Sequence, residues 1–203
     1  NREDVLKELI QVNPHPSSCF QSIFKNKNVN LLQAICYAYS SFEIFFPFNA
    51  AMTLREYSKV IKTITCALSE LSKQRKKMLN PLTILYRGVH KLDLEGYIPE
   101  SLKGYWPSFT SVFTSLEDCK EYVKEKGSVI FVISLSSRAC HPNVVLENGW
   151  TDYKLNSREV LLFPFFSFVI EKIETGEDGY SYFYINSLAF KTKINKIFIF
   201  FFF

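Results

Sequence analysis

The sequence predicts an α+β fold, with helices in residues 1–80 and strands from residue 81 onward. Before Asn80-Pro81, apolar residues recur at three- and four-residue steps, which is the period of an amphipathic helix. After it, apolar residues form short runs rich in β-branched and aromatic side chains. Because helices and strands are segregated along the chain, a parallel βαβ wind is not expected. The domain prediction is a single domain, 1–203, with a helical lobe at 1–80 and a β-rich core at 81–203.

Three helices are expected in the lobe. The second is an apolar segment from Val29 to about Phe42, and the third begins near a candidate cap at Thr53 and ends at Asn80-Pro81. The apolar face of the first comprises Val5, Leu6, Leu9 and Ile10, and that of the third Leu54, Tyr57, Val60, Ile61, Ile64, Ala67, Leu68 and Leu71.

Short apolar runs predict the strands. Leu82–Tyr86 is the first and delivers Arg87 and Gly88 at its end. The others are expected at Gly104–Ser115, Val129–Ile133, Val160–Ile170 with a break at Pro164, Tyr180–Phe190 and Ile194–Phe203. A short helix from Glu117 to about Lys126 is expected after a cap at Ser115, with Cys119 and Tyr122 turned inward.

Composition disfavours several function classes. The formal net charge of +4 comes from scattered positive residues, so nucleic-acid binding is not expected. The five cysteines are odd in number and lack a CxxC pair, which favours a reducing intracellular compartment and no metal site. The apolar run Ile197–Phe203 is too short to span a bilayer, so no membrane span is expected. The common dinucleotide, P-loop, zinc-protease and serine-hydrolase motifs are absent.

Three polar signals stand at strand positions. Arg87, followed by Gly88, suits either a phosphate or a neighbouring acid, because a guanidinium grips planar anions with parallel donors. Ser111 lies in a run that alternates aromatic and hydroxyl residues. Glu159 precedes a thoroughly apolar run, where a partly desolvated carboxylate serves either an ion pair or chemistry.

Taken in order, Leu85-Tyr86-Arg87-Gly88, Phe109-Thr110-Ser111 and Glu159-Val160-Leu161 resemble the motifs of the mono-ADP-ribosyltransferase family of the arginine-serine-glutamate type. The resemblance covers about residues 54–170. It implies a split pair of mainly antiparallel sheets that hold NAD in the cleft between them, with a helical lobe in front. It also implies transfer of ADP-ribose from NAD to an acceptor, with NAD as the substrate and no metal.

The resemblance further implies a role for each residue. Arg87, with Gly88 beside it, would bind the phosphates and ribose of NAD, and Ser111 would hold the nicotinamide ribose. Glu159 would be the catalytic residue, in contact with the ribose 2′-hydroxyl. A fixed carboxylate there stabilises the positive charge that develops when the nicotinamide bond breaks.

The serine motif departs from the family pattern. Ser111-Val112-Phe113 stands where the family usually has Ser-Thr-Ser, and Phe113-Thr114-Ser115 follows at once, so Ser115 is the alternative to Ser111. Ser111 is favoured because Cys119 then supplies the small helix residue that the family commonly places eight positions after its first serine.

A second departure concerns the acceptor. Ser157 stands two residues before Glu159, where arginine-modifying members have a glutamate that positions the acceptor. A hydroxyl cannot supply that charge, which disfavours arginine as the acceptor and leaves the acceptor protein unknown. Water as the acceptor, giving an NAD glycohydrolase, and a non-catalytic interaction module are the alternatives.

Overall fold

The structure of the protein is a computed structural model. It describes residues 30–40, 64–70, 83–90, 103–135, 143–146, 159–188 and 198–199, together with the isolated residues 3, 4, 7, 26, 49 and 62. The chain divides into two compact units. The first contains Asn1–Lys77, Val144–Lys154 and Phe203, and the second contains Met78–Asn143 and Leu155–Phe202.

The first unit contains helix α3, Leu31–Ser40. Its start is capped by the Asn30 side chain, whose Oδ1 accepts a hydrogen bond from the Leu32 amide at 2.8 Å. Residues 64–70 are also helical. Buried apolar side chains on these two segments are Ala34, Ile35, Tyr39, Ile64, Ala67 and Leu68. The second and third expected helices are therefore confirmed in their described parts.

The rest of the expected lobe stays a prediction, because the apolar face of the first helix lies outside the described residues. The single-domain organisation also stays a prediction. Strand β5, Asn143–Leu146, falls at the boundary between the two units.

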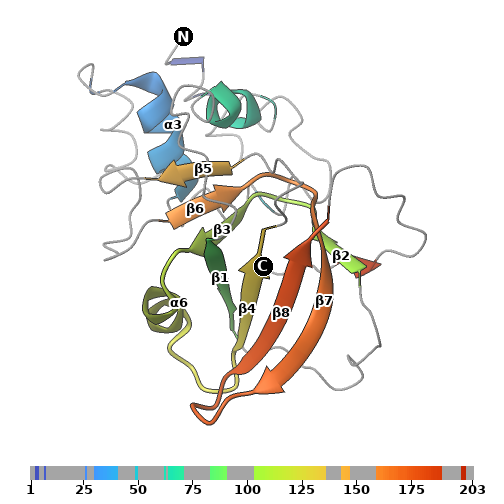
Figure 1. The fold of residues 1–203 in the computed structure, drawn as a ribbon. Coiled ribbons are helices and arrows are strands. Elements are labelled where there is room, and N and C mark those ends of the chain that lie inside the picture. Colours follow the sequence, from blue (N-terminus) through green and yellow to red (C-terminus); the bar gives the residue numbers. More distant parts are fainter. Residues whose placement is uncertain are drawn as a thin grey trace. The chain divides into compact units, whose positions relative to one another are not determined.

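The second unit is a sheet with one helix. Its strand order is β6-β3-β1-β4-β8-β7-β2-β9 (Figure 1). Neighbours are antiparallel except for β4 with β8 and β2 with β9, which confirms the α+β class and the mainly antiparallel pairing. The strands are β1 Ile84–Val89, β2 Lys103–Trp106, β3 Thr110–Phe113, β4 Val129–Ser134, β6 Glu159–Leu162, β7 Phe166–Thr175, β8 Ser181–Ser187 and β9 Phe198–Ile199.

The sheet is nearly divided between β1 and β3. Strand β1 is paired with β4 along its whole length, from Ile84 to Val89, and β3 is likewise paired with β6. By contrast, β1 and β3 share one register pair, Tyr86 with Phe113. We call this pair the strand junction. It joins two groups of strands into one sheet, so the expected pair of sheets is continuous at this point.

The larger group curls around an aromatic core. The rings of Trp106 on β2 and Phe131 on β4 are 5.5 Å apart between centroids, although β8 and β7 separate these strands. In a flat sheet the two strands would lie about 14 Å apart. The concave side is filled by the rings of Trp106, Phe131, Phe166, Phe168 and Phe183.

Several strand boundaries differ from the sequence expectation, among them the end of β7, which continues past Ile170 to Thr175. Strand β1 does not end at Tyr86 but continues through Arg87 and Gly88, because β4 supplies a partner for every one of its residues. The expected strand Gly104–Ser115 is two strands, β2 and β3, with a bend that contains Pro107. Proline has no amide to donate to a ladder, so it interrupts pairing.

The short helix is α6, Leu116–Val123, and Ser115 caps it as expected. Its hydroxyl accepts a hydrogen bond from the Asp118 amide at 3.4 Å. The helix ends before Lys126 because Lys124 adopts a left-handed conformation with φ of 50°. Cys119 is fully buried and Tyr122 is partly buried, so the inward face is also confirmed.

Candidate functional site

Arg87 reaches from β1 to β3 at the strand junction. Its guanidinium Nη1 donates to the main-chain carbonyl of Ser111 at 3.2 Å. The Cζ atom of Arg87 lies 5.4 Å from the ring centroid of Trp106, so the cation also sits over an aromatic face. The structure therefore brings two of the predicted site residues together, and it holds the guanidinium from two strands.

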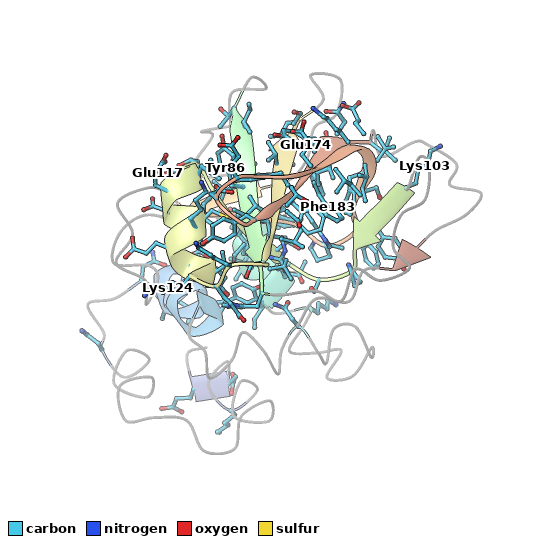
Figure 2. The ribbon with its side chains drawn as sticks, turned by 90° about the horizontal axis from the view of Figure 1, so that it is seen from below. Tyr86, Lys103, Glu117, Lys124, Glu174 and Phe183 are labelled. Atoms are coloured by element: carbon cyan, nitrogen blue, oxygen red, sulfur yellow. The ribbon has the colours of Figure 1, made fainter. Side chains whose placement is uncertain are left out.

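Gly88 has a packing role. A Cβ atom at this position would lie well inside van der Waals contact of Val123 Cγ1, and 3.3 Å from both the carbonyl oxygen and Sγ of Cys119. What approaches the Gly88 backbone is therefore helix α6. Figure 2 shows α6, with Glu117 and Lys124 labelled at its ends, beside the strand that carries Tyr86. Ligand binding by Gly88 stays a prediction.

Glu159 is the first residue of β6, and its side chain is only 5% exposed. The three residues that follow, Val160, Leu161 and Leu162, are fully buried. Burial raises the pKa of Glu159 from 4.5 to about 7, and a side-chain hydrogen bond from Ser111 opposes this rise. Oε2 of Glu159 is buried and has no hydrogen-bond partner within the described part of the chain. The carboxyl group is therefore largely desolvated, and one of its oxygens lacks a hydrogen-bond partner among the described residues.

Ser111 connects the other two residues. Its hydroxyl bonds the Glu159 carboxylate, and its carbonyl accepts from Arg87. The hydroxyl of Ser115 instead forms its hydrogen bonds within α6, because it caps this helix and donates to Glu117 Oε2 at 2.8 Å. The geometry thus favours Ser111 over Ser115 as the motif serine. Ser157 lies outside the described residues.

Comparison with known proteins gives matches among solved structures. No protein-family model and no curated protein matches the sequence. HopU1, an ADP-ribosyltransferase of Pseudomonas syringae pv. tomato, matches with a TM-score of 0.60 and 16% identity, over 92% of this chain and 96% of that one. C3stau2 from S. aureus, solved with NAD, matches with a TM-score of 0.59 and 11% identity, over 89% of this chain and 96% of that one. The Vis toxin, an ADP-ribosyltransferase from Vibrio splendidus, matches with a TM-score of 0.55 and 18% identity, over 96% of this chain and 86% of that one.

The chain has the ADP-ribosyltransferase fold. This likeness confirms the fold that the three motifs implied. The low identities limit it to the architecture, so the roles of Arg87, Ser111 and Glu159 stay predictions.

In this ADP-ribosyltransferase fold, two residues of the candidate site were not identified from the sequence. Trp106 supplies the aromatic face under Arg87, and Phe113 stands across from Glu159 in the β3–β6 ladder. Residues two apart on a strand share a face, so the position of Phe113 two residues after Ser111 was the available signal. For Trp106 the sequence contained no such signal, because the contact of its ring with Arg87 depends on the curl of the sheet.

In the described residues, no group of three or more His, Cys, Asp or Glu side chains could hold a metal ion. No helix among those same residues is long and apolar enough to cross a membrane.

Proposed function

We propose that the protein transfers ADP-ribose from NAD to an acceptor and releases nicotinamide. The observation that carries this proposal is the buried Glu159 carboxylate beside the strand junction, which is hydrogen-bonded to Ser111 and whose Oε2 has no partner among the described residues. Two proteins of the same fold support NAD as the substrate, since C3stau2 was solved with NAD and exoenzyme S from Pseudomonas aeruginosa was solved bound to carba-NAD.

The chemistry follows from the charges. The bond between ribose C1′ and the nicotinamide nitrogen breaks, and nicotinamide leaves with the bonding electrons. Positive charge develops on the ribose, and the ionised Glu159 stabilises it where water is excluded. Oε2 accepts a hydrogen bond from a ribose hydroxyl, and the acceptor then bonds to C1′ and loses a proton.

Arg87 has the complementary role. Its guanidinium carries fixed positive charge and presents donors in a planar fork, which suits the pyrophosphate of NAD. The Trp106 ring and the Ser111 carbonyl restrict the orientation of the guanidinium. Substrate binding then requires less ordering of this side chain.

The acceptor is proposed to be a group other than the arginine guanidinium. Ser157 stands where arginine-modifying enzymes of this type have a glutamate, and a hydroxyl neither carries a negative charge nor acts as a comparable base. Incubation with labelled NAD and cell lysate, followed by identification of the modified side chain, tests this. Label found on arginine would contradict it.

The proposed activity is tested with purified protein and NAD, by measuring nicotinamide release. Glu159→Gln keeps the size of the side chain but removes its charge, so release should fall by about 100-fold or more. Glu171→Gln is the matched control, because Glu171 is an exposed glutamate on β7. Circular dichroism verifies that both variants fold. Equal release by Glu159→Gln and the wild type would overturn the assignment of Glu159.

An NAD glycohydrolase is the second candidate, and Ser157 favours it because the chain lacks the acceptor-positioning glutamate. Release of nicotinamide with no labelled protein, even in lysate, would identify this activity. The third alternative is a non-catalytic interaction module, which calorimetry with NAD tests. Absence of binding at millimolar NAD would favour this alternative.

A further inference from the structure

Phe113 is the residue of β3 that pairs directly with Glu159 of β6. Facing residues of an antiparallel pair have Cβ atoms about 4.5–5.5 Å apart, so the two side chains leave their strands next to each other. On the other side of β3, Phe113 pairs with Tyr86 and forms the strand junction. One apolar residue thus joins the two strand groups and flanks the proposed catalytic carboxylate.

The position of this ring is fixed by its neighbours. Phe113 is 5% exposed and clusters with Cys119 of α6 and Ile130 of β4. Its ring centroid lies 5.5 Å from that of Tyr122. A ring packed by a helix and a second strand has little freedom to swing away from Glu159.

The two β3 residues that share a sheet face with Glu159 differ in the hydrogen bonds they offer it. Ser111 supplies one hydroxyl donor, whereas Phe113 supplies none. A serine at 113, as in the Ser-Thr-Ser pattern, would place a second hydroxyl across from the carboxylate. With phenylalanine there, Oε2 is buried and has no hydrogen-bond partner within the described residues.

We propose that Phe113 is a positioning residue for Glu159, which keeps water and a second donor away from the carboxylate so that Oε2 has no competing donor when the ribose binds. This inference rests on the proposed function. A carboxylate without competing donors in a dry site forms a stronger hydrogen bond to the ribose and interacts more strongly with the charge that develops on it.

The elements packed around Phe113 and Glu159 carry other charged or titratable groups, which the substitutions at position 113 leave unchanged. Residues 110–113 of β3 contain no titratable side chain. On the packed elements β1 and α6, the charged or titratable residues are Tyr86, Arg87, Glu117, Asp118, Cys119, Lys120, Glu121 and Tyr122, and the strand of β4 at Ile130 is apolar. Burial raises the pKa of Cys119 to about 12, so its thiol is neutral at physiological pH.

The test compares Phe113→Thr with Phe113→Val. The two replacements have the same shape and both suit a strand, but only threonine brings a hydroxyl. The titration of Glu159 is followed by NMR of its carboxyl carbon in protein with labelled glutamate, assigned with Glu159→Gln. The pKa of Glu159 should be about one unit lower in Phe113→Thr than in Phe113→Val, because a hydrogen bond to the charged form favours it. The pH profile of nicotinamide release should move in the same direction.

Two further variants complete the test. Phe113→Leu keeps a large apolar side chain and should keep the wild-type titration. Phe109→Leu removes a ring that packs on Phe163 and does not pair with Glu159, so it should also leave that titration unchanged.

The outcomes separate this inference from the proposed function. Equal Glu159 pKa values in the threonine and valine variants would overturn the role of Phe113, whether or not these variants release nicotinamide. If those variants do not fold, a pKa in Phe113→Leu that falls a full unit would overturn it as well. The titration uses no NAD, so a shifted pKa in a protein that releases no nicotinamide would reject the proposed function and support the placement of Phe113.

Discussion

The guanidinium of Arg87 and the main-chain carbonyl of Ser111 are joined by a 3.2 Å hydrogen bond, beside the single register pair that connects β1 to β3. The hydroxyl of the same serine bonds Glu159. Residue 111 thereby links the cation and the carboxylate, one through its backbone and the other through its side chain. Substitution at position 111 should consequently affect only the link to Glu159.

Ser111→Ala should lower nicotinamide release about tenfold or more while changing stability little, because it removes the hydroxyl bonded to Glu159 and keeps the carbonyl that Arg87 needs. Ser115→Ala should do the reverse. It removes the cap of α6 and should lower the free energy of unfolding by about 1 kcal/mol with activity retained. Urea unfolding and nicotinamide release are measured for both. A larger activity loss in Ser115→Ala would make Ser115 the motif serine.

Arg87→Lys should raise the KM for NAD about tenfold or more, with a smaller effect on kcat. The ammonium of lysine keeps the charge but lacks the planar fork that can bond a carbonyl and a phosphate together and lie flat over Trp106. Steady-state kinetics gives the two constants separately. An unchanged KM would show that Arg87 does not bind the phosphates.

Gly88→Ala should destabilise the protein by about 1–3 kcal/mol, because the added methyl group collides with Val123 of α6. The double variant Gly88→Ala/Val123→Ala makes room for that methyl group. The two substitutions should therefore destabilise less together than their separate effects added, which urea unfolding of a double-mutant cycle measures. Simple additivity would mean that α6 does not press on Gly88.

Local patterns were sufficient to predict most of the elements. The apolar runs at Val129–Ile133 and after Glu159 became strands because such runs are buried on both faces. Ser115 was recognisable as a cap because its hydroxyl precedes a helical pattern with an acid three positions later. The order of Arg87, Ser111 and Glu159 predicted the fold through its resemblance to a family.

Contacts that depend on strand order could not be predicted in this way. The stacking of Arg87 on Trp106 requires the sheet to curl until β2 approaches β1 across three intervening strands. The pairing of Phe113 with Glu159 requires the register between β3 and β6, which no local pattern encodes. The extension of β1 through Gly88 depends likewise on β4.

Stability should fall as the pH rises through neutrality, because Glu159 has a pKa of about 7 in the folded chain against an ordinary value of 4.5. Between these values the folded protein holds a proton that the unfolded chain releases. The contribution of Glu159 to the free energy of unfolding should therefore be greatest below about pH 4.5. Above pH 7 this contribution should be lower by on the order of 3 kcal/mol.

Glu159→Gln stays uncharged at every pH and should lack this decrease. Urea unfolding of both proteins at a series of pH values from about 5 to about 8 checks the prediction, since other titrating groups contribute equally and cancel in the difference. The variant should gain stability relative to the wild type as the pH rises. A difference that is constant across this range, or that turns in favour of the wild type, would mean that folding does not raise the pKa of Glu159, and hence that its carboxylate is solvated or paired in the folded protein.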